Sequence, residues 1–198
     1  MTQPLEFAAP EEQARANFYG LLARLFYAPP DASLLGALAN SDELDAEDEA
    51  LAARWRELVA AAATTEAQAV RAEYDEAFVG TGKAPVTLYA CAYSIRYTNE
   101  TPLAALRGDL AALGLARREQ AGEPEDHIAA LCDTMRHLIS GDQRPLDEQR
   151  RFFEHWISPN YEALCSAIEA SERTSFYRCV ARMAKAFFSV EQAAFEML

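Results

Sequence analysis

Basic residues are scarce in this chain. Its 198 residues include 18 lysines and arginines against 31 aspartates and glutamates, which gives a formal net charge of −13. Nucleic acids need a protein surface of the opposite sign, and anionic membrane surfaces repel an acidic one. The composition therefore argues against both partners, and it is compatible with a basic peptide or another positively charged partner.

Long apolar runs and paired cysteines are also missing. No run approaches the roughly 18 apolar residues that cross a bilayer, and residues 1–10 have neither the basic start nor the apolar centre of a secretory signal. The four cysteines form no C-x-x-C pair and have no histidine at zinc-finger spacing, so they are best explained as buried free thiols in a reducing compartment. We therefore expect a cytoplasmic protein without membrane insertion.

Strand signals are almost absent, and helical periodicity takes their place. Apolar residues recur at spacings of three and four along most of the chain, and prolines and glycines stand where helices should begin and end. Residues 83–100 are the exception, but no second strand-like segment exists to pair with them, so we expect an ordered loop with one helical turn. The sequence predicts one all-α domain over residues 1–198, a helical bundle of about nine or ten helices.

Three of the expected helices can be compared directly with the structure. Pro29-Pro30 precedes a short helix over 32–39, Thr65 to Gln68 matches a capping box that opens the next helix but one, and the last helix is expected over about 172–190.

Catalytic and metal-binding motifs are not found. None of the three histidines follows a glutamate by three positions, as a ferritin-like di-iron site would require. Acid–histidine pairs one helical turn apart, such as Asp133–His137, are routine on helix surfaces. The segment Gly80 to Lys83 lacks the spacing of a phosphate-binding loop and fits a helix C-cap better. We therefore expect no catalytic residue, no metal and no cofactor.

Two features remain unusual. One is an aromatic-rich segment over 74–97, whose rings either fill the core or line a site. The other is Glu123-Pro124-Glu125-Asp126-His127, at the start of a periodic helix. Carboxylates suit a helix N-terminus, with Glu125 or Asp126 as the expected cap, but a protonated imidazole gains nothing from that end of the dipole. The cluster is therefore either a capping device or a recognition site.

Several sequence blocks occur together in this order. They are Glu73 to Gly80 (EYDEAFVG), Asn99-Glu100 with the helix that leads to Leu115, Glu123 to Ala129 (EPEDHIA), Phe152 to Trp156 (FFEHW) and Phe176-Tyr177. With these blocks the chain resembles the TorD/DmsD/NarJ family of cytoplasmic molybdoenzyme maturation chaperones, also called redox enzyme maturation proteins. It departs from the family pattern after Phe78, where Gly80-Thr81-Gly82 stands in place of Gly-Pro.

The resemblance implies a TorD-like all-α chaperone rather than an enzyme. Such a protein binds the twin-arginine signal peptide and the apo-subunit of a molybdenum oxidoreductase, protects it, and assists cofactor insertion before export, as a monomer or homodimer. The peptide-binding residues that the resemblance implies are Tyr74, Phe78, Gly80, Pro85, Tyr89, Glu123, Asp126 and His127. Two alternatives stay open on the residues themselves: a metal-dependent helical enzyme and a plain helical adaptor.

Overall fold

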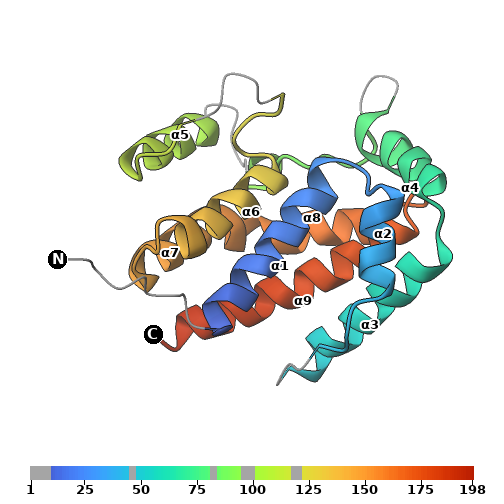
Figure 1. Ribbon diagram of the computed structural model, residues 1–198. Coiled ribbons are helices and arrows are strands. Elements are labelled where there is room, and N and C mark those ends of the chain that lie inside the picture. Colours follow the sequence, from blue (N-terminus) through green and yellow to red (C-terminus); the bar gives the residue numbers. More distant parts are fainter. Residues whose placement is uncertain (1–9, 45–47, 81–83, 95–100, 117–121) are drawn as a thin grey trace.

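The computed structural model describes residues 10–44, 48–80, 84–94, 101–116 and 122–198 (Figure 1). Within these ranges the chain is helical and contains no strand, apart from one isolated antiparallel bridge between Tyr89 and His127. The all-α prediction is confirmed. That residues 1–198 form a single domain stays a prediction.

The α-helices follow one another with short connections. Their bounds are α1 (Pro10–Tyr27), α2 (Ala32–Ala39), α3 (Glu49–Thr64), α4 (Ala67–Tyr74), α5 (Pro102–Ala112), α6 (Ile128–Arg136), α7 (Leu146–Phe152), α8 (Ser158–Ala170) and α9 (Phe176–Glu196). A 3₁₀ turn, η2 (Ala90–Tyr93), supplies the helical turn that was expected in the loop.

Three π-helical turns extend these helices without a break. η1 (Asp75–Val79) continues α4, η3 (His137–Gly141) continues α6, and η4 (Phe153–Ile157) joins α7 to α8. Counted as continuous rods, the described residues form eight helices, slightly fewer than expected. The difference arises at Ser158-Pro159, where η4 continues into α8 and no separate rod begins. Proline is tolerated in a first turn, and the π turn before it lets the rod continue.

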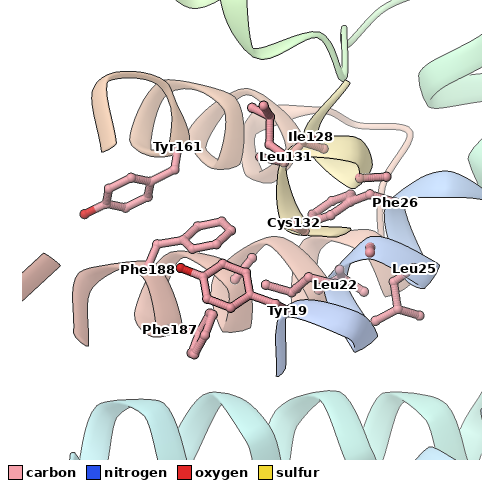
Figure 2. Packing of buried hydrophobic residues seen from close by; sticks show 14 of the residues in the cluster. Tyr19, Leu22, Leu25, Phe26, Ile128, Leu131, Cys132, Tyr161, Phe187 and Phe188 are labelled. Atoms are coloured by element: carbon pink, nitrogen blue, oxygen red, sulfur yellow. The ribbon is translucent and has the colours of Figure 1, made fainter. Parts of the chain in front are cut away.

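The core lies between α1, α6, α8 and α9. Figure 2 shows side chains from all four helices meeting there, with aromatic rings from α1, α8 and α9. Tyr19 of α1 packs edge-on against Phe187 of α9, with ring centroids 4.9 Å apart, and Tyr161 of α8 contacts Phe188 at 5.5 Å. Outside this core, α3 covers α9, α2 packs on α3, and α5 lies at the edge of the molecule (Figure 1).

Two expected helix starts differ from the structure. The capping box at Thr65 is wrong: the N-cap of α4 is Glu66, whose side chain makes no capping bond, while the Thr65 hydroxyl donates to the carbonyl of Ala61 in the preceding helix. The last helix begins at Phe176 rather than near residue 172 and continues to Glu196. In contrast, the helix expected over 32–39 is confirmed, with Asp31 as its cap.

The cysteines fit their expected role. Cys91, Cys132 and Cys165 are buried free thiols, and Cys179 is half-buried. Burial raises the pKa of Cys165 to about 12, which keeps this thiol protonated and unreactive.

Candidate functional site

The N-cap of α6 is His127 itself. Its Nδ1 accepts a hydrogen bond of 3.2 Å from the backbone N–H of Ala129. The predicted cap at Glu125 or Asp126 is therefore wrong. A neutral imidazole has a lone pair for this role, and burial lowers the pKa of His127 and favours that neutral form. A carboxylate cap would leave His127 without a role, but His127 itself caps the helix.

Two backbone hydrogen bonds join the start of α6 to the loop over 84–90. The N–H of Ala90 donates to the carbonyl of Asp126 at 2.8 Å, and the N–H of Ile128 donates to the carbonyl of Leu88 at 2.9 Å. These bonds flank the Tyr89–His127 bridge, where the two rings meet edge-on with centroids 5.5 Å apart. The backbone thus fixes Tyr89 against the helix start.

Tyr89 and Glu123 form a polar pair that reaches the surface. The Tyr89 hydroxyl donates to Oε2 of Glu123 at 2.6 Å, and Tyr89 remains 37% exposed. This hydrogen bond, more than burial, raises the pKa of Tyr89 to about 12, so the hydroxyl keeps its proton. Glu123 keeps oxygen lone pairs for a further donor, because one carboxylate accepts several hydrogen bonds.

Asp126 and His127 lie inside the protein rather than on its surface. They are only 7% and 4% exposed. Burial raises the pKa of the Asp126 carboxyl, which is hydrogen-bonded to the Cys91 thiol. Neither side chain presents a polar atom to solvent in the way that Glu123 does. Their geometry is that of residues that position the loop.

Tyr74 and Phe78 form an aromatic cluster with Tyr177 of α9. The ring centroids of Phe78 and Tyr177 are 4.9 Å apart, and those of Tyr74 and Phe78 are 5.2 Å apart. The buried Tyr74 hydroxyl donates to the carbonyls of Phe26 and Tyr27 at the end of α1, at 3.0 and 3.1 Å. Tyr74 therefore fills the core, whereas Phe78 is only half-buried.

The two clusters are neighbours. Burial, followed by the charge of Glu123 and the nearby Tyr89 hydroxyl, raises the pKa of Tyr74 to about 12. The N–H of Val86 donates to the carbonyl of Ala77 at 3.0 Å, which ties the loop to η1. The eight residues that the resemblance implies thus come from α4, from η1 and its C-cap Gly80, from the loop over 84–90, and from residues 123–127, which lead into α6.

Gly80 and Pro85 flank residues 81–83, which lie outside the described part of the chain. Gly80 ends η1 with φ of +62°, a left-handed conformation that glycine adopts without strain. This agrees with the expected helix C-cap at Gly80. Pro85 is exposed beside Val86.

Sequence reasoning missed three residues around these clusters. Tyr27 and Val79 are large side chains left 58% and 57% exposed, next to Tyr74 and Phe78 respectively. Glu73 has a different role: its carboxylate accepts hydrogen bonds from the backbone N–H groups of Ser175, Phe176 and Tyr177. The acidic position of the Glu73–Gly80 block is therefore a cap on α9 from another helix, which no local pattern reveals.

A separate groove of about 590 Å³ opens between α5 and the α7–η4 rod. Its walls carry acidic, basic, aromatic and aliphatic side chains, among them Asp109, Leu113, Arg144, Glu148, Arg151 and Trp156. Among the described residues, no group of three or more histidine, cysteine or acidic side chains is arranged to hold a metal ion. Nor is any helix in those ranges both long and apolar enough to cross a membrane.

Comparison with known proteins identifies the family. No curated protein matches the chain. The sequence profile described as "Nitrate reductase delta subunit" matches residues 42–166, well over half of the chain. The match includes the blocks at 73–80 and 123–129 and leaves out α1 and α9, so the surface described above is drawn mostly from the matched part. The predicted resemblance is confirmed: the chain belongs to the nitrate reductase delta subunit family, a family of maturation chaperones for molybdoenzymes.

Proposed function

We propose that this protein is a cytoplasmic chaperone that binds the twin-arginine signal peptide of an immature molybdoenzyme subunit. It holds the apo-subunit until the molybdenum cofactor is inserted, and it performs no catalysis of its own. The family supplies the kind of partner, a molybdoenzyme catalytic subunit. The peptide as the bound segment is our inference from the surface chemistry.

The observation that carries the proposal is the exposed Tyr89–Glu123 pair. The ends of α1 and η1 and the loop over 84–90 also leave side chains in solvent, and we propose that they form one recognition surface with this pair: Tyr27, Val79, Pro85, Tyr89 and Glu123. A twin-arginine signal peptide combines guanidinium groups with an apolar stretch. A carboxylate binds guanidinium well, and exposed aromatic and aliphatic side chains take the apolar part.

Seven of the eight predicted residues then divide into two groups, while Gly80 ends η1. Tyr89, Glu123 and Pro85 are accessible to a peptide, and Phe78 is half-buried. Tyr74, Asp126 and His127 are buried, so they act by holding the accessible residues in place. Alanine at Asp126 or His127 therefore weakens binding through the position of the loop.

Binding of a labelled peptide, followed by fluorescence anisotropy, tests the proposal. The probe is the twin-arginine signal peptide of the molybdoenzyme encoded nearest in the genome, and a second peptide has both arginines changed to alanine. We expect binding of the first peptide to weaken as salt rises, since screening acts on exposed charges. We expect Glu123→Gln to weaken it about three- to tenfold, the effect of about 0.7–1.4 kcal/mol for one partly exposed charged pair.

The matched control is Glu66→Gln, which removes the same charge from an exposed residue at the start of α4 whose side chain makes no capping bond. It should leave the affinity unchanged. Equal binding of both peptides, or equal effects of the two glutamine variants, would refute recognition at Glu123. Capture of the folded subunit without any peptide binding would favour the plain adaptor instead.

A further inference from the structure

Polar contacts along its length attach α5 to the rest of the protein, in addition to its leucine side chains. Nε and Nη2 of Arg107 donate to the two carboxylate oxygens of Glu125, each at 3.0 Å. Oδ2 of Asp109 accepts from the indole N–H of Trp156 at 2.9 Å. At the C-terminal end, Nη2 of Arg144 donates to the carbonyl of Leu113 at 3.0 Å.

The apolar face of α5 is narrow. Leu106 and Leu110 are buried, Leu103 and the following Leu113 pack half-buried against the core, and the helix makes few contacts with the other elements. It stands apart from the bundle in Figure 1. Gly108 lies exposed in its middle, where a glycine weakens a helix. Regions with few buried contacts and exposed hydrogen bonds open locally at a lower free energy than the core.

Because α5 borders the groove, a local opening of this helix would also change the groove. Asp109, Ala112 and Leu113 form one wall of the 590 Å³ groove, and Trp156, Phe152 and Arg144 belong to the opposite walls. Gly114, just beyond the C-cap Leu113, has φ of +75° and open space where a Cβ would lie, so no side chain at this turn packs against the bundle. Moving α5 would widen the groove and uncover the Trp156 indole.

We propose that α5 is a cover helix that closes the groove beside Trp156 and opens as a unit, with the Arg107–Glu125 ion pair as its fastening. The pair is suited to repeated release. The Arg107 side chain is 51% exposed, and ion pairs at such exposure are weak. Glu125 itself is only 12% exposed while Arg107 is in place.

The cover helix is also linked to the recognition surface, through Glu125. This part of the inference rests on the proposed function. Glu125 lies two residues after Glu123 and two before His127, so a peptide guanidinium arriving at Glu123 comes close to the Arg107–Glu125 pair. Competition of two guanidinium groups for neighbouring carboxylates loosens α5. Peptide binding is therefore coupled to opening of the groove.

Hydrogen–deuterium exchange of the full chain without any ligand tests the cover. We expect the amides of α5 to exchange at least 100-fold faster than those of α9. Their exchange rate should not change at low denaturant, because it proceeds through a local opening. Arg107→Gln should speed exchange in α5 up to about fivefold, the range that an exposed pair allows. The control, Arg56→Gln, breaks a 2.8 Å pair with Glu49 on α3 at nearly the same exposure, 52%, and should leave α5 unchanged.

The cover is ruled out if α5 exchanges only with global unfolding, or if the two arginine variants affect α5 equally. Trp156→Phe gives an independent check, because it keeps an aromatic ring in the groove but removes the donor to Asp109, and it should also speed exchange in α5. Saturation with the twin-arginine peptide should speed it further. A peptide that binds without changing α5 overturns the coupling, whereas absence of peptide binding overturns the proposed function and leaves the cover to the ligand-free experiment.

Discussion

The carboxylate of Glu73 is expected to stabilise the start of α9. It accepts three backbone hydrogen bonds, at 2.9 Å from Ser175, 3.1 Å from Phe176 and 2.7 Å from Tyr177. These N–H groups open a 21-residue helix, and Ser175, its N-cap, makes no side-chain capping bond. Glu73 thus satisfies donors that a helix start otherwise leaves to water.

The cost of losing this carboxylate follows from three contributions. Removal of an ordinary N-cap costs about 0.5–2 kcal/mol, hydrogen bonds to a charged acceptor are roughly twice as strong as neutral ones, and a negative charge at a helix start adds about 0.3–1 kcal/mol. We therefore expect Glu73→Ala to lower the free energy of unfolding by about 2–4 kcal/mol. Glu73→Gln keeps one acceptor oxygen and should lower it by about 1–2 kcal/mol.

Urea unfolding followed by circular dichroism measures this difference. Glu172→Gln is the control, because it removes the same charge from an exposed residue just before α9 and should stay within about 0.5 kcal/mol of wild type. The amides of Phe176 and Tyr177 should also lose exchange protection in Glu73→Gln alone. If the two glutamine variants are equally stable, the cap contributes nothing measurable and the reasoning fails.

Two further predictions concern the residues that hold the recognition surface. Tyr74→Phe removes the donor to the carbonyls of Phe26 and Tyr27 and should destabilise the protein by about 1–3 kcal/mol in urea unfolding; an unchanged midpoint would show that water replaces the hydroxyl. Burial lowers the pKa of His127 from 6.5, so the folded state binds fewer protons than the unfolded chain below that pH. Stability should therefore fall between pH 7.5 and 5.5, by at most about 1.4 kcal/mol per pH unit, and His127→Asn should remove this fall because asparagine caps helices without titrating. The raised pKa of Asp126 has the opposite effect on stability at lower pH, so Asp126→Asn in the same series separates its contribution from that of His127. If His127→Asn leaves the pH dependence unchanged, the fall in stability does not come from His127.

Local sequence rules predicted the helices whose signals lie next to them. α2 begins after Pro29-Pro30-Asp31 as expected, because the Asp31 side chain caps it directly. The start of α9 was misplaced because its capping carboxylate is 102 residues away in the chain. The cap of α6 was misassigned because the usual capping residues were present, while only burial makes a neutral histidine a suitable acceptor.

The family blocks predicted which segments meet, but not which side chains reach solvent. Glu73 and Tyr74 fasten α4 to α9 and α1, and the backbones of Asp126 and Ile128, on either side of His127, hold the loop over 88–90. These residues of the 73–80 and 123–129 blocks therefore form a frame, the set of contacts that holds the helices and the loop together. The residues best placed to meet a partner, Tyr89 and Glu123, owe their position to that frame. A partner can therefore change its sequence while the frame stays the same, because only the few exposed side chains have to change with it.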